Sequence, residues 1–257
     1  MKRILSAICL GVAMAGTAGL ADASLIVSNL IADNYWGSND HGYGDVISSP
    51  SSKNFFNIDH LRVDYYTGNL MQVTVYTGFV QGDSRAEGTK YGDLFISTDG
   101  WHPAGTSADH YKNDNYLNGE KWEIVVDTYD GGASGNVYGG NFSILRSENL
   151  IDPSRYIFRD GQEVQRGSGG ILLDSHPVVF GTDAYNGVSY NTIQYTLDTS
   201  KLGIHPGDAL GFKWGMTCAN DTIEGGNHVP VPEPASLALF AIGLAGLACM
   251  SKRRVPE

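Results

Sequence analysis

Hydrophobic and polar residues alternate with a period of two in many short segments of this chain, and few segments carry a helical period. The clearest segment places Leu210, Phe212, Trp214 and Met216 on one face and Gly211, Lys213, Gly215 and Thr217 on the other. Met71, Val73 and Val75 form one face of a second segment, and Trp122, Ile124 and Val126 form one face of a third. Successive side chains of a strand point to opposite faces, so the pattern predicts strands with one buried and one solvated face, as in antiparallel sheets.

Further segments are rich in aromatic and β-branched residues and are separated by Gly, Asn and Asp. They predict strands at residues 25–31, 61–66, 91–97, 141–146, 177–180 and 191–197. Asp160-Gly161 predicts a hairpin in which residues 155–158 meet residues 163–166, because Asp-Gly suits a turn that needs positive φ. Helix is expected only as a turn over residues 199–202, entered at Asp198.

Many short strands in one body favour two packed antiparallel sheets, and we expect a jelly-roll-like β-sandwich. A barrel is the alternative. Residues 24–229 are enough for one well-buried core, and they contain no low-complexity linker and no internal repeat. We therefore expect a single all-β domain over residues 24–229.

The first residues have the pattern of a secretory signal peptide. Lys2 and Arg3 form a basic head, residues 4–20 are apolar or small, and Ala21-Asp22-Ala23 fits an A-x-A cleavage site. We expect signal peptidase to remove residues 1–23. A first transmembrane helix is the alternative, and it fits less well because the apolar run is rich in Gly and Ala.

The last residues, 230–257, combine three features in order. Pro232-Glu233-Pro234 is followed by an apolar run over residues 235–250, and Lys252, Arg253 and Arg254 form a basic stop. As a helix the apolar run spans roughly 24 Å, which is shorter than the roughly 30 Å hydrocarbon core of a bilayer. The basic residues would hold this end of the chain in the cytoplasm and leave the body outside.

This order of features resembles the PEP-CTERM sorting signal of Gram-negative bacteria that make exopolysaccharide. The resemblance implies export across the inner membrane and removal of the tail by an exosortase, an integral membrane cysteine protease. The C-terminal helix would hold the chain in the inner membrane only transiently, and the processed protein is expected at the cell surface or in the extracellular matrix. A permanent C-terminal anchor is the alternative.

The body is strongly acidic. It holds 12 of the 17 Lys and Arg residues and 25 of the 28 Asp and Glu residues, which gives a formal charge of −13. Such a surface repels nucleic acid and anionic lipid, whereas divalent cations and neutral polymers are compatible with it. Cys218 is the single cysteine of the body, so it cannot form an internal disulfide, and we expect a buried apolar thiol.

Three loop regions have the composition of calcium-binding loops, at residues 33–45, 109–120 and 127–132. Calcium takes six to eight oxygen ligands, and Gly-rich loops let backbone carbonyls turn inward. The expected ligands are Asp40 and Asp45, followed by Asp127 and Asp130. Ordinary turn chemistry is the alternative, because Asp, Asn and Gly are common turn residues and none of these loops has EF-hand spacing.

Aromatic residues stand beside Asp, Asn or Gly in the same loops. Sugar rings stack their C–H faces on aromatic rings while Asp and Asn bind hydroxyls, so this mixture suits a glycan-binding groove. We expect glycan contacts from Tyr35, Trp36, Tyr43 and Trp101, and the other loop aromatics include Tyr111, Tyr116, Tyr129 and Tyr138. Burial of these rings at the ends of the sheets is the alternative.

Several segments also resemble a recurring group of PEP-CTERM proteins to which no activity is assigned. They are Tyr35-Trp36-Gly37, residues 40–45, residues 91–95, and residues 214–221 with Ile223-Glu224-Gly225. The resemblance implies an all-β body and assigns no catalytic residue.

The motifs G-x-S-x-G and H-E-x-x-H are absent from the sequence, and its seven His residues show no metal-binding spacing. We therefore expect no catalytic residues, and predict a non-catalytic binding or adhesion module associated with exopolysaccharide. The alternatives are a secreted polysaccharide-active hydrolase or lyase and a self-associating structural matrix protein.

Overall fold

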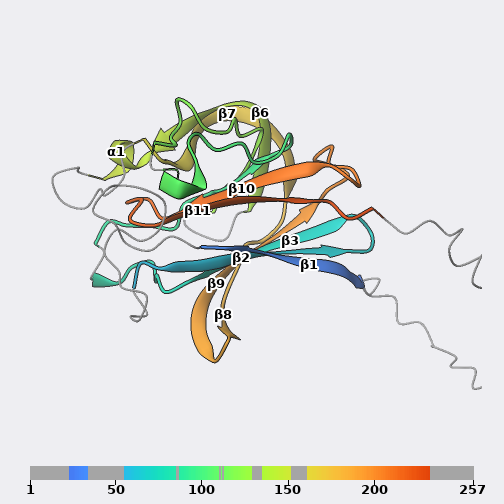
Figure 1. Cartoon of the computed structure of the whole chain (residues 1–257), viewed down its shortest axis with the longest axis horizontal. Coiled ribbons are helices and arrows are strands. Elements are labelled where there is room, and N and C mark those ends of the chain that lie inside the picture. Colours follow the sequence, from blue (N-terminus) through green and yellow to red (C-terminus); the bar gives the residue numbers. More distant parts are fainter. Residues whose placement is uncertain are drawn as a thin grey trace, which may run out of the picture.

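The structure is a computed structural model that describes residues 23–33, 55–84, 87–109, 111, 113–128, 135–151 and 161–231. Strands dominate these residues and form two antiparallel sheets that lie one above the other (Figure 1). The predicted all-β class with two antiparallel sheets is thereby confirmed. The finer prediction of a jelly roll stays a prediction, as do the boundaries of the expected domain.

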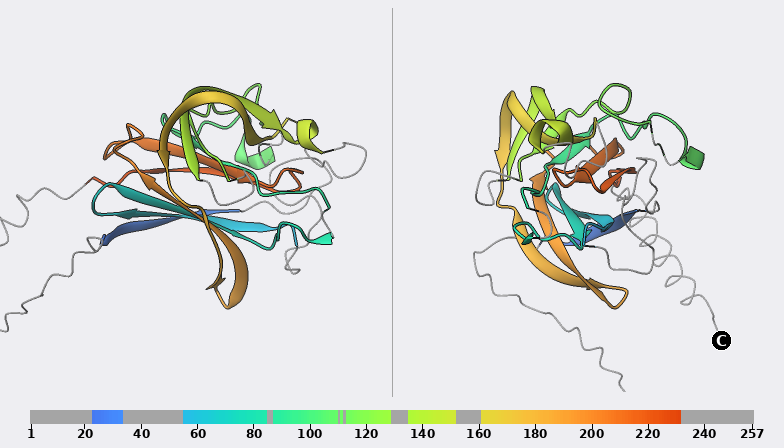
Figure 2. Two further views of the ribbon diagram at one scale, coloured as in Figure 1. Left: turned by 180° about the vertical axis from the view of Figure 1, so that it is seen from behind. Right: turned by 90° about the vertical axis from the view of Figure 1, so that its left-hand side faces the viewer.

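The first sheet has five strands. In spatial order they are β1 (Leu25–Ala32), β2 (Ile58–Tyr66), β3 (Leu70–Thr77), β9 (Val188–Asp198) and β8 (Val179–Tyr185). β8 and β9 form a two-residue hairpin through Asn186 and Gly187, which have φ values of 49° and 77°. This Asn-Gly pair fits the turn because both central residues need positive φ. The resulting ribbon extends beyond the rest of the sheet (Figure 2).

The second sheet has six strands. In spatial order they are β11 (Thr222–His228), β10 (Ala209–Gly215), β4 (Leu94–Ser97), β5 (Ile124–Val126), β6 (Asn136–Arg146) and β7 (Glu163–Ser175). Among the described residues, the helical turns η2 (Ser107–Asp109) and α1 (Ser147–Leu150) accompany the strands. The expected turn over residues 199–202 is present, and the backbone N–H of Ser200 donates to Asp198 Oδ1 at 3.1 Å.

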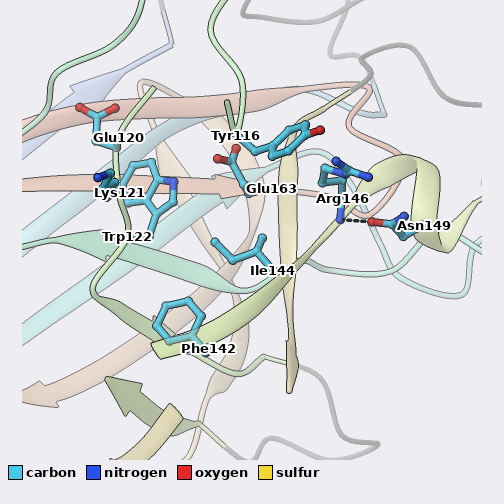
Figure 3. Close-up of a pocket in the computed structure, with 9 residues that line it drawn as sticks. All are labelled: Tyr116, Glu120, Lys121, Trp122, Phe142, Ile144, Arg146, Asn149 and Glu163. Carbon is cyan, nitrogen blue, oxygen red and sulfur yellow. Dashed lines mark hydrogen bonds between the residues drawn. The ribbon is translucent and has the colours of Figure 1, made fainter. Parts of the chain in front are cut away.

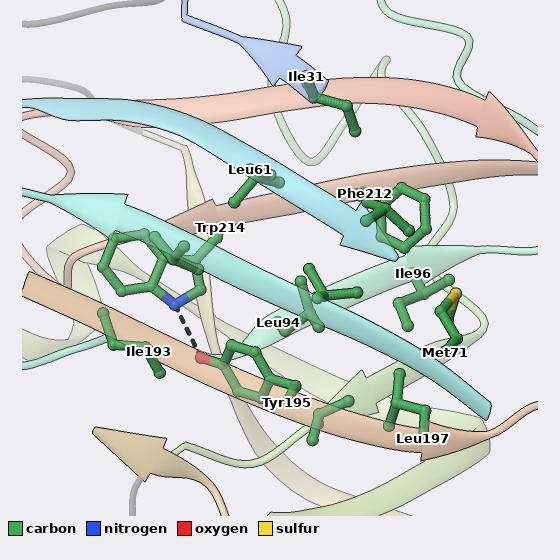
Figure 4. Close-up of a cluster of buried hydrophobic side chains, with 14 of the residues drawn as sticks. Ile31, Leu61, Met71, Leu94, Ile96, Ile193, Tyr195, Leu197, Phe212 and Trp214 are labelled. Atoms are coloured by element: carbon green, nitrogen blue, oxygen red, sulfur yellow. Dashed lines mark hydrogen bonds between the residues drawn. The ribbon is translucent and has the colours of Figure 1, made fainter. Parts of the chain in front are cut away.

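The hydrophobic core lies between the two sheets (Figure 4). It is built from the alternating positions that the sequence predicts, and Phe212 and Trp214 of one sheet lie opposite Ile193 and Tyr195 of the other. Trp214 Nε1 donates to the hydroxyl of Tyr195 at 3.0 Å. A buried indole N–H without a partner would be costly, so this hydrogen bond both satisfies the donor and joins the sheets.

Most predicted strands are present, but β11 was not expected from the pattern of the sequence. Gly225 and Gly226 interrupt its alternation. A Cβ on Gly225 would lie 2.4 Å from Ile31 Cγ2, and one on Gly226 would lie 2.8 Å from the carbonyl oxygen of Leu210. These glycines therefore permit close approach of neighbouring segments, whereas in the sequence they are typical of a loop.

The face of β10 that was predicted to be solvated is in fact buried. Lys213 is only 1% exposed, and Gly211 and Gly215 on the same face are buried as well. The start of β7 and the connection between β4 and β5, residues 98–123, lie on this side, and Lys213 Nζ contacts Gln162 and Glu163 there. A Cβ on Gly211 would stand 2.6 Å from the carbonyl oxygen of Gly100 in that connection.

One other local prediction needs correction, and one stays a prediction. Within the third predicted strand, Ile124 and Val126 face the main core, but Trp122 precedes the strand and packs with Phe95 and Val125 on the opposite face. Residues 163–166 belong to β7 and pair with residues 144–146 of β6. Their expected hairpin partner, residues 155–158, lies outside the described residues.

The predicted buried thiol is confirmed, because Cys218 is a free cysteine with 1% exposure. Within the described part of the chain, no helix has the length and apolar character needed to cross a membrane. The expected signal segment up to residue 22 and the tail from residue 232 lie outside that part.

Candidate functional site

The outer face of the six-stranded sheet carries a second, smaller hydrophobic cluster. Phe95, Trp122 and Val125 are its buried members. Tyr138, Phe142 and Ile144 of β6 pack against them and are only partly buried. The cluster arises because alternate residues of β4, β5 and β6 point away from the main core. It forms the floor of a surface pocket.

This pocket has a volume of about 520 Å³ (Figure 3). Its lining combines aromatic, apolar, charged and amide side chains, namely Tyr116, Glu120, Lys121, Trp122, Phe142, Ile144, Arg146, Asn149 and Glu163. Tyr116 is 42% exposed, and the guanidinium carbon of Arg146 lies 4.1 Å from the centre of its ring. The backbone N–H of Arg146 donates to Asn149 Oδ1 at 3.0 Å. The pocket therefore presents a partly exposed aromatic ring, one face of which Arg146 covers, beside several hydrogen-bonding groups.

A buried ammonium group lies beside the pocket. Lys213 Nζ donates to Gln162 Oε1 at 3.0 Å and to Glu224 Oε1 at 2.8 Å, and it also forms an ion pair with Glu163. Burial by itself would lower the pKa of Lys213, but the attraction of Glu163 and Glu224 more than offsets this and raises the pKa above its usual value. Lys213 is therefore charged.

The connection between β4 and β5 brings two more carboxyl groups to the same place. Asp114 Oδ1 accepts a hydrogen bond from the backbone N–H of Ala104 at 2.8 Å, and the carbonyl oxygen of Asp114 accepts one from Gln162 Nε2 at 2.7 Å. A Cβ on Gly119 would lie 2.4 Å from Asp114 Oδ1, so glycine leaves room for this carboxylate. Glu120 follows directly and is 8% exposed.

Asp114, Glu120 and Glu224 form a buried carboxylate cluster, in which one oxygen from each lies within 4.8 Å of the others. Among the described residues, neither carboxylate oxygen of Glu120 has a hydrogen-bond partner. Burial, followed by repulsion from Glu224 and Asp114, raises the pKa of Glu120 to about 8. Burial raises the pKa of Glu224 to about 7, although Lys213 opposes this rise. The cluster thus holds more acidic groups than its one ammonium group neutralises.

The structure places the predicted glycan residue Trp101 next to this carboxylate cluster. Its Nε1 donates to Glu224 Oε2 at 3.2 Å, and its ring packs edge-on against Tyr111 at 5.3 Å between centres. Trp101 does not line the pocket. Tyr116, one of the other predicted loop aromatics, does line it.

Asp127 is the predicted calcium ligand that the structure describes, and it lies apart from the carboxylate cluster. Its two carboxylate oxygens accept hydrogen bonds from Arg166 Nε at 2.9 Å and Nη2 at 2.8 Å. The hydrogen bonds to Asp127 raise the pKa of Arg166. The role of Asp127 as a calcium ligand stays a prediction.

The remaining predicted site residues lie outside the described residues, with the exception of Ala23. They are Asp40, Asp45 and Asp130, the aromatics Tyr35, Trp36 and Tyr43, the signal residue Ala21, and the sorting residues Pro232, Glu233, Pro234, Lys252, Arg253 and Arg254. Ala23 is partly buried just before β1. These predictions stay untested by the geometry.

Sequence reasoning located one part of the carboxylate cluster and missed the rest. Asp114 and Glu120 belong to the acidic loop region at residues 109–120 that was noted for its calcium-like composition. Glu163, Lys213 and Glu224 were not singled out as site residues. The sequence carries no local signal for Lys213 and Glu224, because a charged residue next to a buried one is also what an ordinary strand with one solvated face shows.

Comparison with known proteins gives one match. Residues 230–254 match the family described as the PEP-CTERM protein-sorting motif. This confirms the recognition of the tail as a sorting signal, and it indicates an exported protein of a Gram-negative bacterium that an exosortase processes. No curated protein and no solved structure matches the chain.

Proposed function

We propose that this chain is a non-catalytic polysaccharide-binding module outside the cell. The chain carries a PEP-CTERM sorting motif and is therefore an exosortase substrate. The pocket on the outer face of the six-stranded sheet is its binding site. The observation that carries the proposal is the exposed ring of Tyr116 above a pocket of about 520 Å³ that is also lined by Arg146 and Asn149.

The chemistry of the pocket suits a sugar chain. Tyr116 and Phe142 offer apolar ring surface on which the C–H faces of a pyranose can stack. Arg146, Asn149 and Lys121 offer donors, and Glu163 offers acceptors, for the hydroxyls around the ring. A few polar groups on an apolar floor are typical of small-ligand sites, where the polar groups fix the orientation of the ligand.

The charge of the protein favours a neutral polymer. The body carries a formal charge of −13, which repels polyanions at a distance. The exopolysaccharide of the producing bacterium is the first ligand to test, and neutral glucans, mannans and galactans form a panel beside it.

Affinity electrophoresis of the purified protein in gels that contain each polysaccharide tests the proposal. Retardation by at least one neutral polymer is expected, and isothermal titration calorimetry with its oligosaccharides should then give a dissociation constant. If the exopolysaccharide of the producer and every neutral polymer leave the mobility unchanged, the pocket is not a polysaccharide site.

A second candidate function is hydrolysis or elimination of the same polymer. Glu120 and Glu163 both line the pocket, and the pKa of Glu120, which burial raises to about 8, would keep a general acid protonated near neutral pH. Release of reducing ends or of unsaturated products during prolonged incubation would favour this candidate. Binding without product release would favour the non-catalytic module.

A further inference from the structure

We infer that Asp114, Glu120 and Glu224 bind a hard divalent cation, with calcium as the best-fitting ion, next to the pocket. The site combines two carboxylates of one expected calcium loop region, residues 109–120, with Glu224 of β11, and it uses none of the four ligands expected from the sequence, Asp40, Asp45, Asp127 and Asp130. The inference does not depend on polysaccharide binding, because it concerns the attachment of the β4–β5 connection to the sheet.

The spacing of the carboxylates fits one ion. An oxygen from each of the three lies within 4.8 Å of the others. Calcium holds carboxylate oxygens at about 2.3–2.6 Å, so two oxygens on opposite sides of one ion are at most about 5 Å apart. Three oxygens at this spacing can contact one common ion after small side-chain movements.

A second and independent observation concerns Glu120. Its side chain is 8% exposed, it belongs to the carboxylate cluster, and neither of its oxygens has a hydrogen-bond partner among the described residues. A buried carboxylate normally accepts hydrogen bonds or faces a cation, because removal of an ionised group from water is costly. A bound cation would satisfy both oxygens.

The charge balance of the cluster leads to the same conclusion. Lys213 supplies one positive charge, and its ammonium group is already engaged by Glu163, Glu224 and Gln162. One oxygen each from Asp114 and Glu120 lies within 4.8 Å of an oxygen of Glu224. Four carboxyl groups thus surround one ammonium group, and a divalent ion would offset most of the excess negative charge.

The supporting residues hold two of the three carboxylates in place. The backbone N–H of Ala104 donates a hydrogen bond to the carboxylate of Asp114, and the side-chain amide of Gln162 donates one to the backbone carbonyl of Asp114. Trp101 Nε1 and Lys213 fix Glu224. Ligands that are oriented in this way lose little freedom when an ion binds.

The ligand chemistry selects the class of metal. All three candidate ligands are carboxylates, and the group contains neither His nor Cys. Such oxygen donors favour calcium, magnesium or manganese over zinc or copper. Because Glu120 also lines the pocket, the ion has a route from solvent, and waters in the pocket could complete its coordination.

The ion would link two distant parts of the sequence. Asp114 and Glu120 belong to the long β4–β5 connection, whereas Glu224 lies in the middle of β11. A ligand that binds only the folded state stabilises it in proportion to the logarithm of its concentration. Calcium should therefore strengthen the attachment of this connection to the sheet.

Isothermal titration calorimetry and thermal unfolding of the purified protein test the inference, first in EDTA and then with added calcium chloride. The proteins compared are the natural chain, Glu120→Gln, and the control Glu87→Gln, whose parent side chain is exposed. Calcium at about 100 times its dissociation constant should raise the unfolding temperature of the natural chain and of the control by about 5 °C or more. Glu120→Gln should bind calcium at least tenfold more weakly and lose most of the rise.

If Glu120→Gln folds poorly, the variant Asp114→Asn replaces it. Terbium luminescence then provides a second measurement of ion binding. Terbium replaces calcium at oxygen sites, and Trp101, which contacts Glu224, should sensitise its emission. Calcium should quench this signal by displacement, and Asp114→Asn should weaken it. The inference is overturned if neither calcium nor magnesium binds the natural chain, or if a folded Glu120→Gln binds calcium as tightly as the natural chain does.

Discussion

Lys213 and Glu224 are direct cross-strand partners in β10 and β11, and their ammonium and carboxylate groups lie 2.8 Å apart. Their side chains are only 1% and 2% exposed. Cross-strand neighbours on one face of a sheet are close enough for their side chains to interact. This pair therefore places a charged cluster inside the protein. Each of the two groups stabilises the charged state of the other.

Substitution of Lys213 by Met should strongly destabilise the protein. Glu163 and Glu224 would lose their cation and remain buried, and the removal of one partner of a buried ion pair costs about 3–5 kcal/mol. Urea denaturation followed by tryptophan fluorescence should show a lower midpoint with a similar slope.

Lys201→Met is the matched control for this substitution. Lys201 also pairs with a carboxylate, Asp174, at 2.7 Å, but its side chain is 50% exposed. Exposed ion pairs add little to stability, so the midpoint should hardly move. Equal losses in the two variants would show that the burial of Lys213 has no special importance.

Asp93 should make stability depend on pH. Burial raises its pKa to about 7, although the backbone N–H groups of Arg166 and Thr128 donate to its two oxygens and oppose the rise. The unfolded carboxyl ionises near pH 4, so between about pH 4 and pH 7 the folded state binds more protons. Stability should fall as pH rises through this range, by up to about 1.4 kcal/mol per pH unit from this residue.

Asp93→Asn isolates that contribution. The amide keeps one acceptor but turns an NH₂ group toward a backbone N–H, so the variant should be less stable, by about 1–3 kcal/mol. Because the variant no longer titrates at this position, its deficit should be larger at pH 5 than at pH 8. Urea unfolding of both proteins in EDTA at these pH values measures the difference, and a deficit that is the same at both values would contradict the assignment.

Gly92→Ala should destabilise the junction between β4 and the end of β10. A Cβ at residue 92 would lie 2.2 Å from the carbonyl oxygen of Gly215 and 2.6 Å from that of Val164. Both contacts are with backbone, which cannot rotate away, so a loss of about 1–3 kcal/mol or more is expected.

Gly181→Ala serves as the control for Gly92→Ala. Its added Cβ would meet only Thr192 Oγ1, at 3.3 Å, and the position lies in a strand at the edge of its sheet. Thermal unfolding should give nearly the natural melting temperature for this variant. A similar loss in both variants would mean that crowding at Gly92 is relieved by the surrounding backbone.

Tyr116→Ala should weaken polysaccharide binding without loss of the fold. Its ring is 42% exposed at the pocket, and ring packing on an aromatic side chain is worth about 0.5–1.5 kcal/mol, so the dissociation constant should rise about two- to tenfold. Leu117→Ala is the control, since Leu117 is 74% exposed in the same loop and does not line the pocket. Affinity electrophoresis compares the two, and equal retardation would remove Tyr116 from the binding site.

The sequence by itself determined the class of the fold and the presence of a sorting motif. Alternation at Phe212 and Trp214, and at Ile193 and Tyr195, identified buried strand faces, because side chains point to opposite sides at every second residue. The order of Pro232-Glu233-Pro234, an apolar run and a basic stop identified the sorting motif. Both signals are local, so no knowledge of distant contacts was needed.

Only the tertiary structure decided which polar residues are buried and which of them meet. Alternation predicts that the two faces of β10 differ, but it says nothing about what lies against each face, and Lys213 is buried against Gln162, Glu163 and Glu224. Glu120 and Glu224 are about a hundred residues apart in sequence, and a pattern with a period of two carries no information on such pairs. The candidate ion site exists because the fold brings these carboxylates together in a region shielded from water, where their mutual repulsion is strong.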